Sequence, residues 1–203
     1  MQRTFEKVLI RAGIPAWYTQ GFNPHAKMVF SLPLSLGTES ACEFLDIRIV
    51  TRMTLNEIKA RLDSALTDEL AVVKVYEPKT KLSDIAFAEY EININTKGAD
   101  EALCEKINGL FSLSPLMMTK KSKSGDREID IIPLIRSFRA ELIDGIIRIN
   151  CLLACEAGSS LNPEMLITAM KERLSILSTD IMEEDYSIFR KNVYLSDGVT
   201  VFE

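Results

Sequence analysis

The order in which the apolar patterns follow one another constrains the fold of this chain more than any other feature. Apolar residues at helical spacing predict helices over residues 2–12 and 54–66, and runs typical of strands cover residues 27–34, 42–50 and 70–76. A polar segment that contains a proline, residues 77–86, follows them. The order helix, strand, strand, helix, strand is that of a βαββαβ unit without its first strand.

A similar pattern continues beyond residue 86. Strands are predicted over residues 89–95, 116–121, 145–155 and 186–195, helices over 99–111 and 162–174, and an irregular or strand segment interrupted by Pro133 over 129–142. We therefore predict an α+β chain of two tandem ferredoxin-like (βαββαβ) halves, an incomplete one at residues 1–80 and an embellished one at 81–203. Sequence identity between the halves is not evident, so the repeat is one of pattern only.

The absent first strand has a physical consequence. It lies in the interior of a ferredoxin-like sheet, so its loss leaves unpaired backbone groups and an open apolar face. The helix over residues 2–12 also starts without a capping residue. We expect the natural protein to start upstream of Met1. In the alternative, another segment or subunit fills the gap, and self-association through the incomplete sheet would result.

Composition excludes several classes of function. The 203 residues are 47% hydrophobic, enough for a sizeable core, yet no segment has the roughly 18 to 20 unbroken apolar residues of a membrane span. The N-terminus has no signal-peptide pattern either, so we expect a cytoplasmic protein without a membrane partner. The net charge of −5 disfavours a large non-specific nucleic-acid surface, although a local basic patch is compatible with it.

The four cysteines are spaced unlike metal ligands. Cys151 and Cys155 share one face of a predicted strand, but the third ligand of a CxxxCxxC iron–sulfur motif would fall on Gly158. We predict that Cys42, Cys104, Cys151 and Cys155 are buried free thiols and that this chain carries no cofactor.

The stretch RTFEKVLIRAGIPAWYTQGFNPHAKMVFSLPLSLGTESACEFLDI resembles the radical-SAM-linked protein family, an uncharacterised domain fused to, or encoded beside, a radical-SAM protein. The similarity is close over positions 3 to 50 and continues more weakly through GDREIDIIPLI (125–135) and GSSLNPEML (158–166). The resemblance implies an accessory role to a radical-SAM partner that holds the iron–sulfur cluster and S-adenosylmethionine. Family members often lie near genes for ribosomal proteins and a ribonuclease, which points to RNA.

Members of that family normally carry a strand and a Ser-His-Leu-Asp segment ahead of the first helix. This chain lacks both, in agreement with a start upstream of Met1. Because the chemistry of the family is not established, the resemblance assigns no catalytic residue here.

The loop after the first helix is the first candidate site. Gln20, Gly21, Asn23, His25 and Lys27 precede an apolar strand, and this stretch is the part of the chain shared most clearly with the family. In one interpretation they form a polar cluster that binds the phosphate or base edge of a ligand. In the other, Gly21 and an Asn-Pro pair shape an ordinary turn into the strand.

The densest basic cluster is the second candidate. KKSKSGDR has the composition of a flexible hairpin loop, and its cations Lys120, Lys121, Lys123 and Arg127 are candidate phosphate contacts. Neighbouring acidic residues partly cancel their charge, so a solvated turn is the alternative. We interpret Glu39 and Glu43, which flank a turn, as structural or subunit-facing residues.

Three functional hypotheses follow. In the first, the chain is a non-catalytic accessory module that presents a substrate, RNA or a ribosomal component, to a radical-SAM enzyme. In the second, it is an autonomous RNA-binding, RNA-processing or RNA-modifying enzyme, with His25 as general acid or base and Lys27 or Lys120 stabilising phosphate charge. In the third, it is a structural protein that recruits a partner by strand addition.

Overall fold

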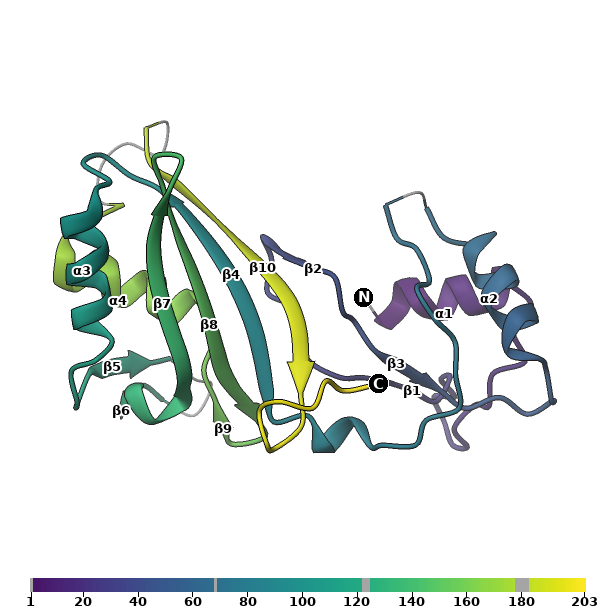
Figure 1. Cartoon of the computed structure of the whole chain (residues 1–203). Coiled ribbons are helices and arrows are strands. Elements are labelled where there is room, and N and C mark those ends of the chain that lie inside the picture. Colours follow the sequence, from purple (N-terminus) through teal and green to yellow (C-terminus); the bar gives the residue numbers. More distant parts are fainter. Residues whose placement is uncertain (1, 68, 122–124, 178–182) are drawn as a thin grey trace. The chain divides into compact units, whose positions relative to one another are not determined.

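The computed structural model describes residues 2–67, 69–121, 125–177 and 183–203 (Figure 1). The chain forms two compact units. Unit 1 comprises Met1–Ser31, Phe44–Thr80 and Glu203, and unit 2 comprises Leu32–Glu43 and Lys81–Phe202. Both units mix helices and strands, which confirms the α+β class. Among the described residues, no helix is long and apolar enough to cross a membrane.

Unit 1 packs two helices against a small antiparallel sheet. The helices are α1 (Gln2–Arg11) and α2 (Leu55–Asp63), and the strands are β1 (Met28–Phe30) and β3 (Leu45–Ile47), which pair with Met28 opposite Ile47. Figure 1 shows both helices on the same side of the two strands. The predicted helices are confirmed within one to three residues at each end.

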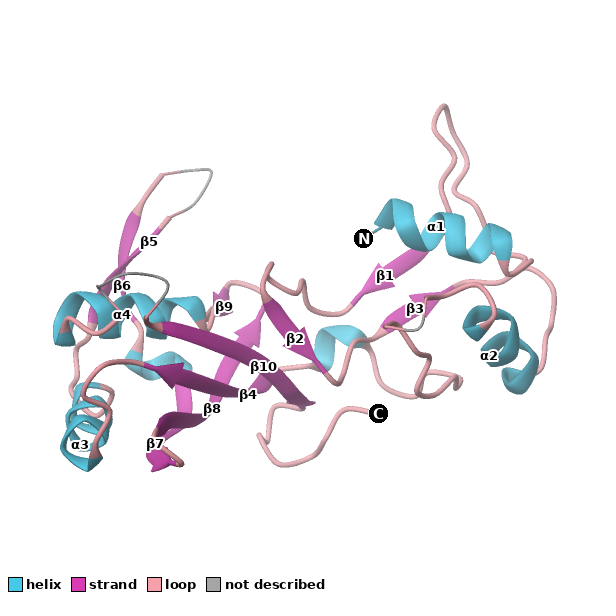
Figure 2. Cartoon of the chain, turned by 90° about the horizontal axis from the view of Figure 1, so that it is seen from above, coloured by secondary structure: helices cyan, strands magenta, loops and turns pink. Residues whose placement is uncertain are grey.

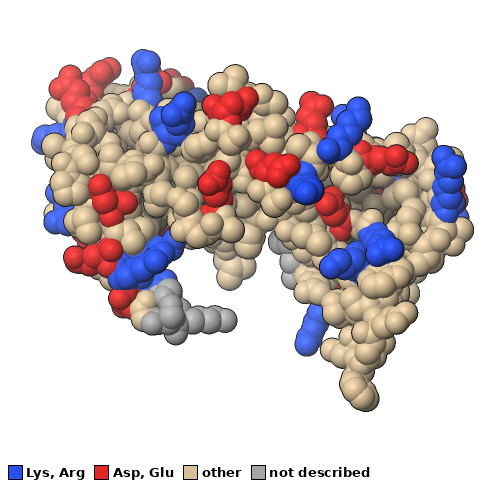
Figure 3. Space-filling view, turned by 90° about the horizontal axis from the view of Figure 1, so that it is seen from below, with Lys and Arg blue, Asp and Glu red and all other residues tan. Residues whose placement is uncertain are grey.

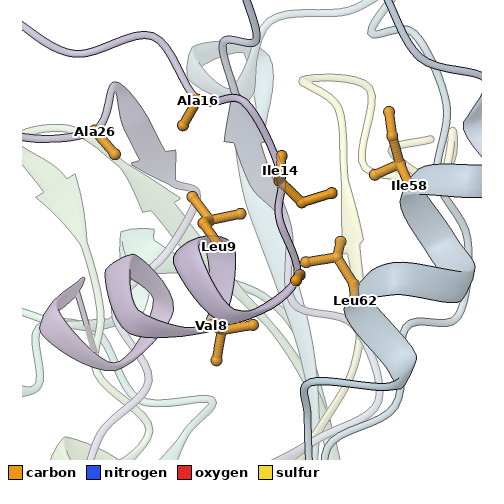
Figure 4. Close-up of a cluster of buried hydrophobic side chains, with 8 residues drawn as sticks. Val8, Leu9, Ile14, Ala16, Ala26, Ile58 and Leu62 are labelled. Carbon is orange, nitrogen blue, oxygen red and sulfur yellow. The ribbon is translucent and has the colours of Figure 1, made fainter.

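The core of unit 1 lies between these helices and strands (Figure 4). Val8 and Leu9 of α1 and Ile58 and Leu62 of α2 are buried, because apolar residues at these spacings fall on one helix face. The remaining buried members come from the segments that follow α1: Ala12, Ile14, Ala16 and Ala26.

The start of α2 shows how the sequence specifies its local structure. The Thr54 hydroxyl accepts the backbone N–H of Glu57 at 3.2 Å and so caps the helix. The Glu57 carboxylate accepts from Arg61 Nη2 at 2.7 Å, one turn further along the helix.

Unit 2 is built on a sheet with the order β2-β10-β4-β8-β7. Its main strands are β4 (Phe87–Asn95), β7 (Ile135–Ile143), β8 (Ile146–Glu156) and β10 (Asp185–Tyr194), all antiparallel to their neighbours among these four. Helices α3 (Glu101–Leu110) and α4 (Glu164–Leu174) lie on the same side of the sheet (Figure 1). These six elements follow one another in βαββαβ order.

Three short strands complete unit 2. The strand β5 (Met117–Lys120) pairs with β6 (Arg127–Asp130) in a separate hairpin, and β9 (Ser159–Ser160) pairs with the end of β8. A 3-10 turn at Ile132–Leu134 separates β6 from β7, where Pro133 was predicted to interrupt a strand. The hairpin explains why residues 116–121 form a strand but do not join the main sheet.

The sheet of unit 2 also contains a strand from the first part of the sequence. β2 (Thr38–Ser40) pairs in parallel with β10, with Glu39 opposite Phe189. The strands predicted over residues 27–34 and 42–50 are therefore shorter than expected, because the chain between β1 and β3 leaves their sheet.

The prediction of a strand over residues 70–76 is wrong, since these residues form no strand in the structure. Val72 and Val75 instead pack as an extended segment on the core of unit 1. Within its described residues, unit 1 thus has a two-stranded sheet, and the tandem ferredoxin-like arrangement stays a prediction.

Candidate functional site

The candidate loop is the tip of a short hairpin between α1 and β1. The Thr19 N–H donates to the His25 carbonyl at 2.9 Å, and the Lys27 N–H donates to the Trp17 carbonyl at 2.8 Å. Tyr18 lies opposite Ala26 between these bonds. Figure 2 shows this hairpin projecting from unit 1. Backbone pairing at the base therefore holds the loop in a defined shape.

The hairpin has one face toward the core and one away from it. Ala26 is 1% exposed and belongs to the core. Because side chains alternate along paired strands, the neighbours of Tyr18 and Ala26 point the other way. The residues on this outer side are Trp17, Thr19, His25 and Lys27.

Arg48 adds a second cation to the same side. Its guanidinium carbon lies 4.8 Å from the centre of the Trp17 ring, a cation–π contact. The backbone fixes this position, since the Trp17 N–H donates to the Arg48 carbonyl at 2.7 Å and the Arg48 N–H donates to the Lys27 carbonyl at 3.1 Å. We call the set Trp17, Thr19, His25, Lys27 and Arg48 the cation–aromatic face.

The Lys, Arg and His side chains of this face have no acidic partner in the described part of the chain. None of His25, Lys27 and Arg48 forms an ion pair there. All three side chains are exposed. Figure 3 views unit 1 from the side opposite α1 and α2, where Lys and Arg side chains stand beside Asp and Glu. The face can therefore bind an anion without first breaking an internal pair.

One carboxylate limits the charge of this side of unit 1. Asp46 of β3 is two residues from Arg48 on the strand, and burial raises the pKa of its carboxyl group. Burial also raises the pKa of Tyr76, with smaller contributions from the nearby charges of Asp46 and Glu203.

His25 has a defined ring orientation. Its Nδ1 lies 3.2 Å from the Asn23 carbonyl oxygen and 3.1 Å from Thr19 Oγ1, which also accepts the His25 backbone N–H at 3.1 Å. Because a carbonyl oxygen can only accept, the contact with Asn23 places the proton of the neutral ring on Nδ1. The exposed Nε2 is then an acceptor that faces solvent.

The structure brings together only part of the predicted loop cluster. His25 and Lys27 lie on the cation–aromatic face, and Asn23 contributes its backbone carbonyl to His25. Gln20 and Gly21 lie at the exposed tip of the hairpin. Gly21 has a φ of +130°, which residues other than glycine rarely adopt. The turn interpretation therefore accounts for Gly21, while ligand binding by His25 and Lys27 stays a prediction.

Sequence reasoning missed three members of the face. Trp17, Thr19 and Arg48 were not singled out as site residues from the sequence. The alternation of residues 44–50 did indicate that Arg48 points away from the apolar side of its strand. No signal in the sequence places that strand beside Trp17.

The basic hairpin of unit 2 is a weaker site. Lys120 Nζ donates to the Ser160 carbonyl at 2.8 Å, so this lysine has a structural role. Arg127 lies opposite Lys120 across the hairpin and is exposed, as is Lys121. Lys123 lies outside the described residues. Lys121 and Arg127 stay predicted phosphate contacts.

Burial governs the ionisation of the cysteine thiols. All four cysteines are free, with Cys104 and Cys151 buried and Cys42 and Cys155 partly buried. Burial raises the pKa of both Cys151 and Cys155 to about 12, so neither is a thiolate near neutral pH. The described residues contain no group of three His, Cys, Asp or Glu side chains that could hold a metal ion.

These features define the chain as a mixed α+β protein of two units with an exposed cation–aromatic face on the first. The chain belongs to a family of uncharacterised proteins conserved in bacteria (DUF2344), whose model matches residues 1–163. That range covers all of unit 1 except Glu203, together with much of unit 2. No curated protein and no solved structure matches the chain.

Proposed function

We propose that this chain is a non-catalytic binding module that holds RNA on the cation–aromatic face and works with a separate radical-SAM enzyme. The observation that carries the RNA part is the Arg48 guanidinium over the Trp17 ring, with exposed Lys27 and His25 on the paired strand of the same hairpin. None of the three basic side chains forms an ion pair within the described residues. Cations beside an aromatic ring suit a ligand with alternating phosphates and flat bases.

The radical-SAM part rests on the family resemblance of residues 3–50. In this proposal the iron–sulfur cluster and S-adenosylmethionine belong to the partner, and this chain supplies substrate binding. The proposal includes a tandem ferredoxin-like architecture in which unit 1 is the incomplete half, with self-association through that half as a further prediction.

RNA binding is tested by the salt dependence of affinity. We expect the chain to bind a fluorescently labelled, mixed-sequence RNA of about 12 nucleotides in an anisotropy titration. Each phosphate contact contributes about 0.7 to the slope of log K against log salt for single strands, so K27A/R48A should lower the slope by about 1.4. Lys106→Ala, which removes an exposed lysine of α3, is the control and should leave the slope unchanged.

The partner is tested by a pull-down from native lysate with the tagged chain as bait. We expect mass spectrometry to identify a radical-SAM protein with both wild type and K27A/R48A, while RNA is recovered at low salt with wild type only. An eluate without a radical-SAM protein would contradict the accessory role and leave RNA binding standing.

One observation favours an RNA-processing enzyme as the second candidate. The contact of His25 Nδ1 with the Asn23 carbonyl leaves Nε2 as the group that can exchange a proton with a ligand. If the chain cleaves or modifies RNA by itself, His25→Ala should abolish turnover but retain binding. Unchanged turnover would remove His25 from this role.

A further inference from the structure

The tip of the hairpin presents a large aromatic side chain to solvent. Phe22 is fully exposed, and it lies between Gly21 and the exposed Asn23. An exposed phenylalanine at a loop tip does not contribute the hydrophobic free energy that its burial would add to folding. The loop that carries it is nevertheless held by the backbone bonds at Thr19 and Lys27. The ring therefore stands out from unit 1 on a fixed support.

A second aromatic ring lies at the base of the same hairpin. Trp17 is half-buried, and the Arg48 guanidinium covers part of its face. A guanidinium group stacked on a ring can bind phosphate while the remaining edge and face of the ring contact a base. The hairpin thus carries an aromatic ring at its tip and another at its base, with the cations Lys27 and Arg48 near the base.

We infer that unit 1 binds single-stranded rather than duplex RNA, with unpaired bases stacked on Phe22 and Trp17. This inference rests on the proposed function and adds the class of RNA. Bases in a duplex are stacked on one another, so their faces are closed to a protein ring, whereas a single strand offers every base face. Duplex RNA is instead recognised by contacts spread over many phosphates and 2′-hydroxyls, and this face offers few cations.

The single tryptophan of the chain makes the inference directly measurable. Trp17 is the only tryptophan in the sequence, so intrinsic fluorescence reports on the site itself. The probe is an unlabelled RNA of about 12 nucleotides, used alone or annealed to its complement. We expect the single strand to quench Trp17 and to bind at least about tenfold more tightly than the duplex.

Phe22→Ala tests the tip, and Leu36→Ala is its matched control. Both residues are fully exposed apolar side chains beside a glycine with positive φ, Gly21 and Gly37, so neither change removes a packed side chain. We expect F22A to weaken single-strand binding by about 5- to 150-fold, the range for loss of one base stack, and L36A to leave it unchanged.

The outcomes separate the inference from the proposed function. Equal or tighter binding of the duplex, or equal affinities for F22A and L36A, would overturn the inference while leaving RNA binding intact. If neither single-stranded nor duplex RNA binds, the proposed function fails as well.

Discussion

Burial controls the chemistry of individual cysteine side chains in unit 2. Cys151 and Cys155 lie four residues apart on β8, and desolvation raises both pKa values to about 12. A thiol in the unfolded chain ionises near pH 8.5. The folded state therefore retains protons that the unfolded state has lost, and the free energy of unfolding should fall as pH rises from about 9 to about 12.

This effect is measurable by urea unfolding at neutral pH and at about pH 10. We expect each of the two thiols to contribute a loss of roughly 2 kcal/mol at the higher pH. The variant C151A/C155A, compared with wild type at both pH values, isolates that contribution from other titrating groups. An identical loss in wild type and variant would show that these thiols do not carry the linkage.

Sequence and structure agree unevenly at the residue scale. Scattered cysteines in apolar segments predicted buried free thiols. All four are free, but only Cys104 and Cys151 are buried, while Cys42 and Cys155 are partly exposed. Trp17 was harder to place, because a lone tryptophan two residues after Pro15 has no periodic pattern around it. Its role depends on Arg48, which reaches it only through tertiary pairing. When a residue acts through a partner far away in the sequence, the residues next to it in the sequence do not reveal that role.

At the element scale, the two helices of unit 1 cap each other at their C-terminal ends. Arg11, in the last turn of α1, donates to the Ala65 carbonyl at 3.0 Å just after α2. Arg61, in the last turn of α2, donates to the Gly13 carbonyl at 3.1 Å just after α1. Each arginine thus satisfies a carbonyl that the other helix leaves free at its end, where the helix dipole also favours a cation.

We expect Arg11→Ala and Arg61→Ala each to lower the free energy of unfolding by about 0.5–1 kcal/mol, because both bonds are exposed to solvent. Arg52→Ala removes an exposed arginine from the loop before α2 and should change stability by less than about 0.5 kcal/mol. Chemical denaturation followed by circular dichroism gives all three values. A cost for Arg52→Ala equal to the other two would argue against specific capping.

Elements with strong local signals were predicted well, and elements defined by distant pairing were not. Helices α1 to α4 carry apolar residues at helical spacing, and β4, β8 and β10 alternate over long runs. The three residues of β2 are Thr-Glu-Ser, which have no alternating apolar pattern. They form a strand because β10, far along the sequence, offers a free edge. Residues 70–76 are the opposite case: their β-branched residues predict a strand, but they pair with no strand among the described residues.

At the scale of the whole molecule, the chain passes between its two units at four points, and residues 32–43 belong to unit 2. Arg190 of β10 holds this segment. It is 3% exposed, and its guanidinium donates to Glu43 Oε1 at 2.8 Å and to the carbonyls of Leu32 and Pro33 at 3.4 and 3.3 Å. The interpretation of Glu43 as a structural residue agrees with this geometry. A simple division into residues 1–80 and 81–203 would separate Arg190 from these partners.

The contribution of Arg190 should therefore depend on whether residues 32–43 are present. In the full chain, Arg190→Ala removes the buried cation and leaves carbonyls unpaired, so we expect a loss of roughly 2–3 kcal/mol. In a fragment of residues 81–203, the guanidinium retains its 3.3 Å bond to the Tyr90 hydroxyl and its contact with the Tyr90 ring but loses its partners in residues 32–43, and the same change should cost less than about 0.5 kcal/mol.

Urea unfolding of four proteins, the chain and the fragment with and without the substitution, measures this difference. Glu43→Ala should reproduce part of the loss in the full chain, while Glu39→Ala, which removes an exposed carboxylate from β2, should not. Because Glu43 is itself partly exposed, its removal should cost less than that of Arg190. Equal costs of Arg190→Ala in chain and fragment would mean that Tyr90 and the sheet, rather than the segment 32–43, stabilise the buried arginine.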